Sequence, residues 1–383
     1  MVKPWLKWTA LSAVVALVVA GGVFIYRRSD TPPEISDAPQ QEIDDRFILN
    51  NVTLDQANEN GETVWSMRAT RAIYSPDQQT AEVENPEGEL FQDGEAIYRV
   101  EGDRGVVQRD GRRITLRGNI TATDLRTGAE MTGGELVWVP ADDTMTIRNG
   151  LTGTHPDLTV EADQGQLFGR DQRVELTGNV TIEGREPRMK LTGESLEWQM
   201  EEQIVSSDRP VDVQRLQGQG ERTRVTDQAS SNEAEYRLAE QRLSMNGNVR
   251  MAMREPVMSL ATESLVWEIE NQLVTMNRPL NANLRNGQVL LQGDRGSMDL
   301  AQEIFDLRGS ARATTRRNQS RLRGDRIVWD NGTQEVEAIG NVFYTQADPE
   351  MSSRAPRLVG TLEDQVFVMS GGRVVTEFIP GEQ

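Results

Sequence analysis

The pattern that decides the fold reads Gly193-Glu-Ser-Leu-Glu-Trp198, Thr262-Glu-Ser-Leu-Val-Trp267 and Gly324-Asp-Arg-Ile-Val-Trp329 in its three clearest copies. The same skeleton returns ten times, with steps of 33, 31, 29, 31, 38, 31, 31, 31 and 31 residues. The units begin at Ala69, Gly102, Gly133, Ala162, Gly193, Ser231, Thr262, Gly293, Gly324 and Ala355. A period this steady indicates a stacked array, in which each unit buries its apolar face against its neighbours.

Each unit has the pattern of a β-hairpin. Counted from the unit start as zero, apolar residues recur at plus five (Tyr74, Val107, Trp138, Leu167, Trp198, Tyr236, Trp267, Met298 and Trp329) and at plus twelve (Ala81, Ile114, Met145, Val174, Val205, Leu243, Val274, Phe305, Val336 and Phe367). Polar turn residues such as Asn331-Gly332 lie between them. A spacing of two on each side of a turn is typical of strands with one inward face. The pattern therefore predicts an all-β fold of about ten antiparallel hairpins.

Most units close at plus sixteen with a second turn. It reads Gly-Asn at 118–119, 178–179, 247–248 and 340–341, and Arg-Pro at 209–210 and 278–279. Glycine and asparagine adopt positive φ at low cost, and proline lacks a ladder donor. If each unit gives one strand to each of two sheets, ten layers at about 4.8 Å make a rod of roughly 50 Å.

Position plus three alternates in size. It holds Leu136, Leu196, Leu265 and Ile327 in the units with tryptophan at plus five, and Gly105, Gly165, Ala234 and Gly296 in the units between. The true repeat is therefore about 62 residues, one bulky hairpin and one slim hairpin. We expect this alternation to leave shaped space between the bulky residues of the interior.

The composition excludes several classes of function. With 60 acidic and 41 basic residues the net charge is −19, so we expect no nucleic-acid partner. The chain has no cysteine, and His155, its only histidine, lies in a turn pattern. Paired carboxylates such as Asp142-Asp143 also fall on predicted turns, where acids are common. We therefore predict no catalytic residue, no metal site, no cofactor and no enzyme activity.

The ends of the array indicate three domains. The uncharged run 8–26 is a membrane helix or a signal peptide, and its continuation to Arg27-Arg28 favours an uncleaved anchor over residues 1–28. Residues 29–45 carry Pro32, Pro33 and Pro39 and six acids, which predicts an extended tether. The repeats occupy 46–383, and the polar stretch 214–228 either divides them into two sub-domains or forms a surface loop.

The start of the array resembles the LptC family of lipopolysaccharide-export proteins. The resemblance rests on Phe47-Ile-Leu-Asn-Asn-Val-Thr-Leu54, Glu59-Asn-Gly61, Trp65-Ser-Met-Arg-Ala69, Tyr74, Asn85-Pro86, Gly102-Asp103 and Leu116-Arg-Gly-Asn119. The later Gly-Asn-Val units resemble the related LptA and the wider OstA-like family. An anchor followed by these repeats is the LptC arrangement, although familiar LptC proteins are shorter than this chain.

The resemblance implies an elongated antiparallel β-jellyroll in the periplasm, held by one inner-membrane helix. It implies that lipopolysaccharide acyl chains lie in an apolar trough and that the anchor helix sits beside the transmembrane subunits of an inner-membrane ABC exporter. An LptA-like protein or an outer-membrane LptD-like jellyroll would dock on the edge strands. By position, those edges lie near Phe47 to Leu54 and near Arg373 to Ile379.

Inward residues of the hairpins are the candidate trough lining. We expect them to be Tyr74, Leu136, Trp138, Met145, Leu167, Leu196, Trp198, Val205, Leu265, Trp267, Val274, Met298, Phe305, Ile327, Trp329 and Phe367. For the tryptophans and methionines, ordinary core packing is the alternative. Two other functions stay open. One is a carbohydrate-binding or adhesive surface protein, and the other is a membrane-anchored scaffold with a closed, fully packed interior and no lipid affinity.

Overall fold

The computed structural model describes residues 47–58, 60–92, 94–108, 111–218, 220–255, 257–284, 286–316, 319–347, 350–361 and 366–378. The predicted anchor and tether lie outside these residues. Residues 46–383 form one compact unit. Within the described part of the chain, no helix has the length and apolarity needed to cross a membrane.

The described residues of this unit form 28 strands and two short 3₁₀ helices. The strands are β1 (Phe47–Ala57), β2 (Thr63–Tyr74), β3 (Thr80–Glu84), β4 (Glu87–Gln92), β5 (Glu95–Glu101), β6 (Arg104–Gln108), β7 (Ile114–Asp124), β8 (Glu130–Val139), β9 (Thr144–Thr154), β10 (Leu158–Phe168), β11 (Arg173–Arg185), β12 (Arg188–Gln199), β13 (Ile204–Ser207), β14 (Val211–Gln217), β15 (Arg224–Ser231), β16 (Glu233–Arg237), β17 (Arg242–Arg254), β18 (Val257–Glu268), β19 (Leu273–Met276), β20 (Leu280–Leu284), β21 (Val289–Gly293), β22 (Arg295–Asp299), β23 (Ile304–Thr315), β24 (Arg321–Asp330), β25 (Glu335–Ala347), β26 (Glu350–Thr361), β27 (Val366–Ser370) and β28 (Val375–Phe378). The 3₁₀ helices are η1 (Pro140–Asp142) and η2 (Gly220–Arg222).

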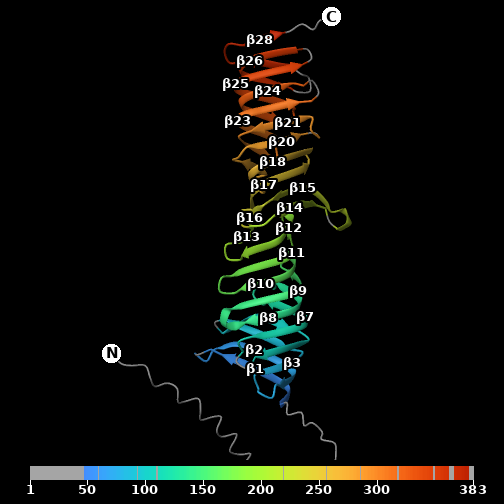
Figure 1. Cartoon of the computed structure of the whole chain (residues 1–383), viewed down its shortest axis with the longest axis vertical. Coiled ribbons are helices and arrows are strands. Elements are labelled where there is room, and N and C mark those ends of the chain that lie inside the picture. Colours follow the sequence, from blue (N-terminus) through green and yellow to red (C-terminus); the bar gives the residue numbers. More distant parts are fainter. Residues whose placement is uncertain are drawn as a thin grey trace, which may run out of the picture. The chain divides into compact units, whose positions relative to one another are not determined.

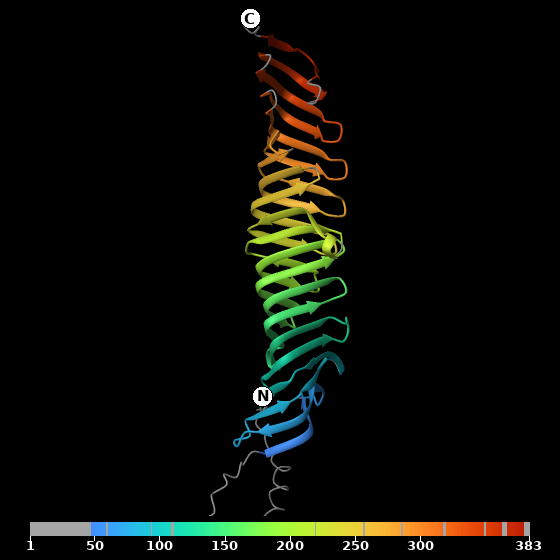
Figure 2. The same ribbon diagram turned by 90° about the vertical axis from the view of Figure 1, so that its right-hand side faces the viewer.

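The strands follow one another along a single axis. Figure 1 shows the array advancing from β1 to β28, and Figure 2 shows the same strands crossing that axis. The hydrogen-bonded pairs are antiparallel, as in the β11–β12 hairpin, where Val174 lies opposite Trp198. The expectation of an all-β antiparallel array of hairpins is confirmed.

The longest strands bend in the middle. The pairing register shifts between Thr177 and Val180 in β11 and between Asn246 and Val249 in β17. The Gly-Asn pairs at 178–179 and 247–248 occupy these places, and all four residues have positive φ. The prediction of a second turn is therefore wrong at these pairs, because each forms a bulge that bends one continuous strand.

Gly178 shows why the bulge requires glycine. Its φ is 76°, and a Cβ atom would lie 2.3 Å from Oδ2 of Asp163. Nδ2 of Asn179 donates a hydrogen bond to the same oxygen over 2.9 Å. The same contact joins Asn119 to Asp103 and Asn341 to Asp325. An aspartate one residue after the unit start therefore holds the bulge, a role that the sequence analysis missed.

The Arg-Pro pairs interrupt strands instead of bending them. β13 ends at Ser207 before Pro210, and β14 begins at Val211; β19 ends at Met276 before Pro279, and β20 begins at Leu280. Proline fixes its own φ and has no N–H to donate to the ladder, so the strand ends there. The chain does not reverse there, because β13 and β14 both pair antiparallel with β12, and β19 and β20 both pair antiparallel with β18. The prediction of a second turn is therefore wrong at these two places as well.

Bulges and proline breaks divide the strands into two facing layers. Layer 1 holds the strand halves with the plus-five and plus-twelve residues, together with β3, β6, β13, β16, β19, β22 and β27. Layer 2 holds the other halves, together with β4, β5, β14, β15, β20, β21 and β28. The long strands connect the layers on one side, and turns such as 125–129 and 140–143 end the strands on the other.

Each unit supplies two strands to each layer, not one. In the last full unit, β24 and β25 pair in layer 1 through Trp329 and Val336, and β25 and β26 pair in layer 2 through Tyr344 and Ser353. The expected length was therefore too short, because twenty strands at about 4.8 Å extend layer 1 over roughly 90 Å. One continuous core cluster fills the space between the layers.

The polar stretch 214–228 lies on a hairpin of layer 2. β14 pairs with β15 from Val211 opposite Ser231 to Gln217 opposite Arg224, and η2 lies in the connection. Figure 1 shows this hairpin reaching beyond the neighbouring turns. On both sides of it the layer continues, since β14 also pairs with β12 and β15 with β17.

Candidate functional site

One line of side chains runs along layer 1 from Tyr74 in β2 to Phe367 in β27. Each residue of the line is the register partner of the next. Most of the predicted trough residues lie on it: Tyr74, Trp138, Met145, Leu167, Trp198, Val205, Trp267, Val274, Met298, Phe305, Trp329 and Phe367. The other four, Leu136, Leu196, Leu265 and Ile327, lie two positions earlier on the tryptophan strands. The structure therefore brings the whole predicted set onto the inner face of one layer.

The tryptophans of this line form a regular ladder. Trp138, Trp198, Trp267 and Trp329 lie on β8, β12, β18 and β24, and three strands of layer 1 separate each from the next. At about 4.8 Å per strand, consecutive tryptophans are roughly 19 Å apart. Hereafter this set is called the tryptophan ladder.

Side chains fill the interior around the ladder. Trp267 and Trp329 are 2% and 1% exposed, and Ile327 is fully buried. Only Tyr74, Trp198 and Phe367 of the predicted set are half-buried, and all three pack against the core. The inward positions are therefore confirmed, and the candidate trough is occupied by the protein's own side chains in this structure.

The small residues at plus three leave no free space. A Cβ atom on Gly105 would lie 2.6 Å from Cδ2 of Leu116, and one on Gly165 would lie 2.8 Å from Cδ2 of Leu151. At Gly296 the nearest side-chain atom, Cδ2 of Leu280, would be 3.1 Å away. The expectation of shaped space between bulky residues is wrong at these glycines, because leucines of neighbouring strands occupy it.

Aromatic contacts join the two layers across the interior. The rings of Trp65, in layer 2, and Trp138 are 6.3 Å apart and nearly perpendicular, and those of Tyr344 and Phe367 are 4.8 Å apart. His155 lies in the turn between β9 and β10, as predicted, with its ring 6.4 Å from that of Trp198. Trp65 was not among the predicted lining residues because it precedes the first full unit.

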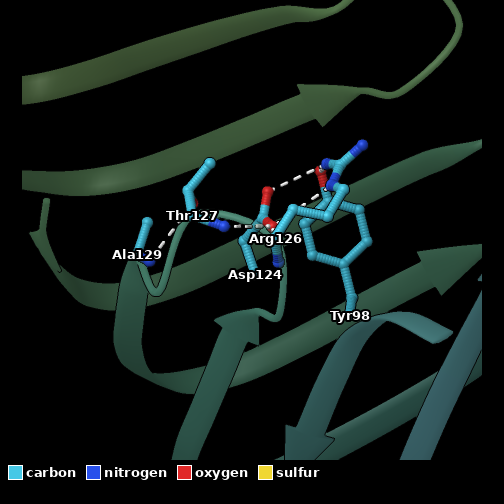
Figure 3. Close-up of polar contacts among 5 residues, drawn as sticks. All are labelled: Tyr98, Asp124, Arg126, Thr127 and Ala129. Carbon is cyan, nitrogen blue, oxygen red and sulfur yellow. Dashed lines mark hydrogen bonds and ion pairs between the residues drawn. The ribbon is translucent and has the colours of Figure 1, made fainter.

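A polar cluster lies at the turn side of layer 2, between β5 and the β7–β8 turn (Figure 3). The Arg126 guanidinium donates to Oδ2 of Asp124 and to the Tyr98 hydroxyl, each over 2.9 Å. Burial opposes ionisation of Asp124, but hydrogen bonds from Arg126 and from the backbone N–H of Thr127 hold the pKa of this carboxyl below its usual range. Burial, helped by nearby carboxylates, raises the pKa of Tyr98.

A second carboxylate faces inward on β15. Asp227 is 5% exposed and alternates with the buried Ala229 and Ser231. Its Oδ2 accepts a hydrogen bond from the Thr226 hydroxyl over 3.0 Å and lies 3.5 Å from the Arg215 guanidinium. Burial raises the pKa of Asp227 and outweighs both of these contacts. Sequence reasoning missed both carboxylates, although an aspartate in an inward phase of a strand was a usable signal.

A groove of about 520 Å³ crosses β14, β15, β17, β18, β20 and β21. On each strand it touches an inward residue, such as Met251, and the two outward neighbours, such as Arg250 and Ala252. This pattern places the groove on the outer face of layer 2. None of the predicted trough residues lines it.

Both ends of the described array expose apolar strand residues. Phe47 and Ile48 of β1 are 57% and 41% exposed, and Val366 and Val368 of β27 are 60% and 63% exposed. In the described part of the chain, β1 pairs only with β2, and β27 and β28 pair only with β26. These strands are edges of the array, as predicted for Phe47 to Leu54. The C-terminal edge includes β28, and Ile379 lies outside the described residues.

Comparison with known families decides the relationship. The sequence profile of the LptC family, described as lipopolysaccharide-assembly, LptC-related, matches residues 13–148 and 145–226, together more than half of the chain. The chain belongs to the LptC family. The resemblance proposed from the sequence is therefore confirmed, and this LptC-related chain is a lipopolysaccharide-assembly protein.

Two further comparisons concern curated proteins and solved structures. No curated protein matches the chain. Among solved structures, a similar one is the crystal structure of LptH, the LptA homologous periplasmic component of the lipopolysaccharide transport device from Pseudomonas aeruginosa. The two sequences are 18% identical, and the match covers 28% of this chain and 79% of LptH with a TM-score of 0.26.

Proposed function

We propose that this LptC-related chain is a membrane-anchored periplasmic component of lipopolysaccharide export. It receives lipopolysaccharide from an inner-membrane ABC exporter in the apolar interior and passes it toward the outer membrane. In this proposal, residues 1–28 are the single-pass inner-membrane anchor, 29–45 are the tether and 46–383 are the periplasmic β-jellyroll. The protein catalyses no reaction and needs no cofactor.

The apolar line along layer 1 carries the proposal. It runs without a charged side chain from Tyr74 to Phe367, so one surface serves acyl chains over roughly 90 Å. Family membership indicates which lipid is transported, since the matched family is described as a lipopolysaccharide-assembly family. Neither observation requires a reactive group, which fits a carrier.

Lipid enters, in this proposal, by separation of the two layers. The long strands connect the layers covalently on the bulge side only, and hairpin turns end the strands on the other side. Opening at the turn side exposes the sixteen predicted lining residues. Acyl chains then replace protein contacts with lipid contacts of similar polarity, so the net cost of opening stays small.

The two exposed ends fit docking partners of the same architecture. β1 and the β27–β28 end present backbone N–H and C=O groups beside exposed Phe47 and Val368. Edge strands of this kind add a further strand by hydrogen bonding. The proposed partners are the exporter's transmembrane subunits for the anchor, and an LptA-like or LptD-like jellyroll for the edges.

A scaffold without lipid transport is the second candidate. The packed interior favours it, because Trp329 is 1% exposed and the glycine positions at plus three are filled by leucines. A scaffold would use the same edges to join membrane complexes, and its layers would stay closed.

Photocrosslinking in the working exporter distinguishes the two candidates. The full chain carries p-benzoylphenylalanine in place of Trp267, a large-for-large exchange on the inner face, in cells that export lipopolysaccharide. The matched control carries it in place of the adjacent Glu268, which alternates to the other face of β18. We expect an ultraviolet-dependent lipopolysaccharide adduct at position 267 and none at position 268.

Two results would contradict the transport proposal. One is a stably folded position-267 variant without any adduct while export continues, which would favour the scaffold. The other is equal adduct formation at both positions, which would place the lipid on the outer surface.

A further inference from the structure

Four buried indole N–H groups have no hydrogen-bond partner in the described structure. They belong to Trp65, Trp198, Trp267 and Trp329, and three of them are members of the tryptophan ladder. Tryptophan has one side-chain donor and no acceptor, and buried indole groups normally find a partner. Orphaned donors that recur at one position of a repeat need an explanation.

The neighbours of the ladder cannot supply an acceptor. The register partners of Trp267 are Leu243 and Val274, and those of Trp329 are Phe305 and Val336. All of these side chains are apolar, and the backbone carbonyls of paired strands already accept ladder hydrogen bonds. The chain therefore brings a row of donors into its interior without acceptors of its own.

Water is a poor partner for these donors. A hollow of about 10 Å³ lies beside Trp65, near the smallest space that holds a water molecule, and its surface is apolar. A water beside Trp267 or Trp329 would find apolar side chains where it needs two to four polar partners. The three ladder residues thus require an acceptor from outside the chain.

We propose that the indole N–H groups of Trp198, Trp267 and Trp329 donate hydrogen bonds to the oxygen atoms at the root of acyl chains. The ligand class is a multiply acylated lipid whose ester or amide carbonyls, or chain hydroxyls, enter the interior with the hydrocarbon. This inference rests on the proposed transport function and adds recognition of acyl oxygen to it. A pure hydrocarbon surface would hold any chain, whereas the ladder selects chains that carry acceptors.

The tryptophan donors follow one another along layer 1 at a spacing of roughly 19 Å. A lipid that moves along layer 1 meets an equivalent donor at every fourth strand, so its acyl oxygens pass from one tryptophan to the next. The unpartnered donors also raise the free energy of the empty, closed interior relative to the loaded one. Loading with acylated lipid therefore favours the open state.

An isosteric amino acid tests the donor without changing packing. In the full chain, purified in detergent, Trp267 or Trp329 is replaced by benzothienylalanine, in which sulfur takes the place of the indole N–H. Two probes are titrated: hexa-acylated lipid A, and a synthetic lipid A analogue whose chains are ether-linked and lack carbonyls. The ether-linked analogue, titrated against the same variants, is the control for packing. Circular dichroism verifies that each variant is folded.

Loss of one hydrogen bond should weaken binding of acylated lipid A about threefold to tenfold at positions 267 and 329. Binding of the ether analogue should change by less than about twofold, since it makes no such bond. In the unmodified chain labelled with ¹⁵N at the indole nitrogen, the Trp267 and Trp329 N–H signals should move downfield with acylated lipid A and less with the ether analogue.

Each failure has a separate meaning. Equal affinity for the two lipids, with unmoved indole signals, would overturn the recognition of acyl oxygen while the transport function stands. Absence of binding by either lipid to the folded, unmodified chain would overturn the transport function and this inference together. An equal loss of affinity for both lipids in the Trp267 and Trp329 variants would show a packing effect and would also overturn the inference.

Discussion

Layer 2 has two inward carboxylates, Asp124 on β7 and Asp227 on β15, whose pKa values are shifted in opposite directions although their surroundings are similar. Each lies at the turn side of the layer, each alternates with buried alanine, and each has an arginine within reach. Yet the pKa of Asp124 is held below its usual range, and the pKa of Asp227 is raised above it.

The number and quality of donors explain the difference. Oδ1 and Oδ2 of Asp124 accept bonds from the Arg126 side chain and from the backbone N–H groups of Arg126 and Thr127. Asp227 accepts one hydroxyl bond from Thr226, and its arginine is 3.5 Å away. Burial opposes the charge in both cases, so the carboxylate with more donors stays ionised more easily. An arginine nearby is not sufficient by itself.

The largest expected effect comes from Asp124→Ala. It leaves the backbone N–H groups of Arg126 and Thr127 without their acceptor and leaves the exposed Arg126 guanidinium with the Tyr98 hydroxyl alone. We expect the free energy of unfolding at pH 7 to fall by about 2 kcal/mol. Urea denaturation measures this, with Asp124→Asn as the control that keeps one side-chain acceptor and loses less.

The sign of the pH dependence sharpens this prediction. Since the folded pKa of Asp124 is lowered, its contribution is complete above the unfolded pKa of about 3.9 and is lost as pH falls through the folded value. The difference between wild type and Asp124→Ala should therefore shrink below about pH 3.9. A difference that persists unchanged at low pH would place the effect in packing.

The opposite sign is expected for Asp227→Asn. The folded pKa of Asp227 is raised, so its stabilising contribution belongs to the protonated form, is complete below about pH 3.9, and is lost as pH rises through the folded value. The asparagine is uncharged at every pH and still accepts the Thr226 bond. We expect the free energy of unfolding of the variant to be about 1 kcal/mol higher than that of wild type at pH 7. Below about pH 3.9 the two free energies of unfolding should be equal.

Asp212→Asn is the matched control for this second carboxylate. It makes the same change of charge on the adjacent strand, β14, at an exposed outward position. Its effect on stability should be near zero. A loss of stability at pH 7 in Asp227→Asn would show that the Arg215 pair outweighs burial, and the contrast between the two carboxylates would disappear.

The smallest effect is expected for Tyr98→Phe. This change removes one of the acceptors of the Arg126 guanidinium and leaves all the donors to Asp124 in place. We expect a loss of about 0.5 to 1 kcal/mol by thermal or urea denaturation. The pH dependence attributed to Asp124 should stay. Its disappearance would mean that Tyr98, and not the turn backbone, holds the arginine in position.

Much of the fold was predictable from residue spacing. The 31-residue period and the apolar phase at plus five and plus twelve predicted hairpins, and they placed Trp267 and Phe305 on the inner face correctly. The alternation of side chains across a strand has a period of two whatever the tertiary context, so a buried face is visible in one dimension. The same rule predicted that the candidate lining residues face the interior.

The Gly-Asn pairs show where spacing alone was insufficient. Positive φ at positions 178 and 179 suits a turn and a bulge equally, and the spacing alone predicted a turn. The outcome depends on Asp163, which lies sixteen residues before Asn179 and accepts the hydrogen bond from its side chain. A contact over this separation is not visible in the local sequence pattern. Because a bulge lets one strand continue from one layer into the other, it also decides how many strands each unit supplies to a layer.

The sequence by itself determined which residues face inward, the length of the repeat, the acidic surface and membership of the LptC family. Only the tertiary structure decided where strands bend, whether the space beside each glycine is filled, and which buried polar groups find partners. The physical reason is that alternation and turn preference act within a few residues. Filling of space and satisfaction of a buried N–H or carboxylate depend on groups that the fold brings in from distant strands, such as Leu151 beside Gly165.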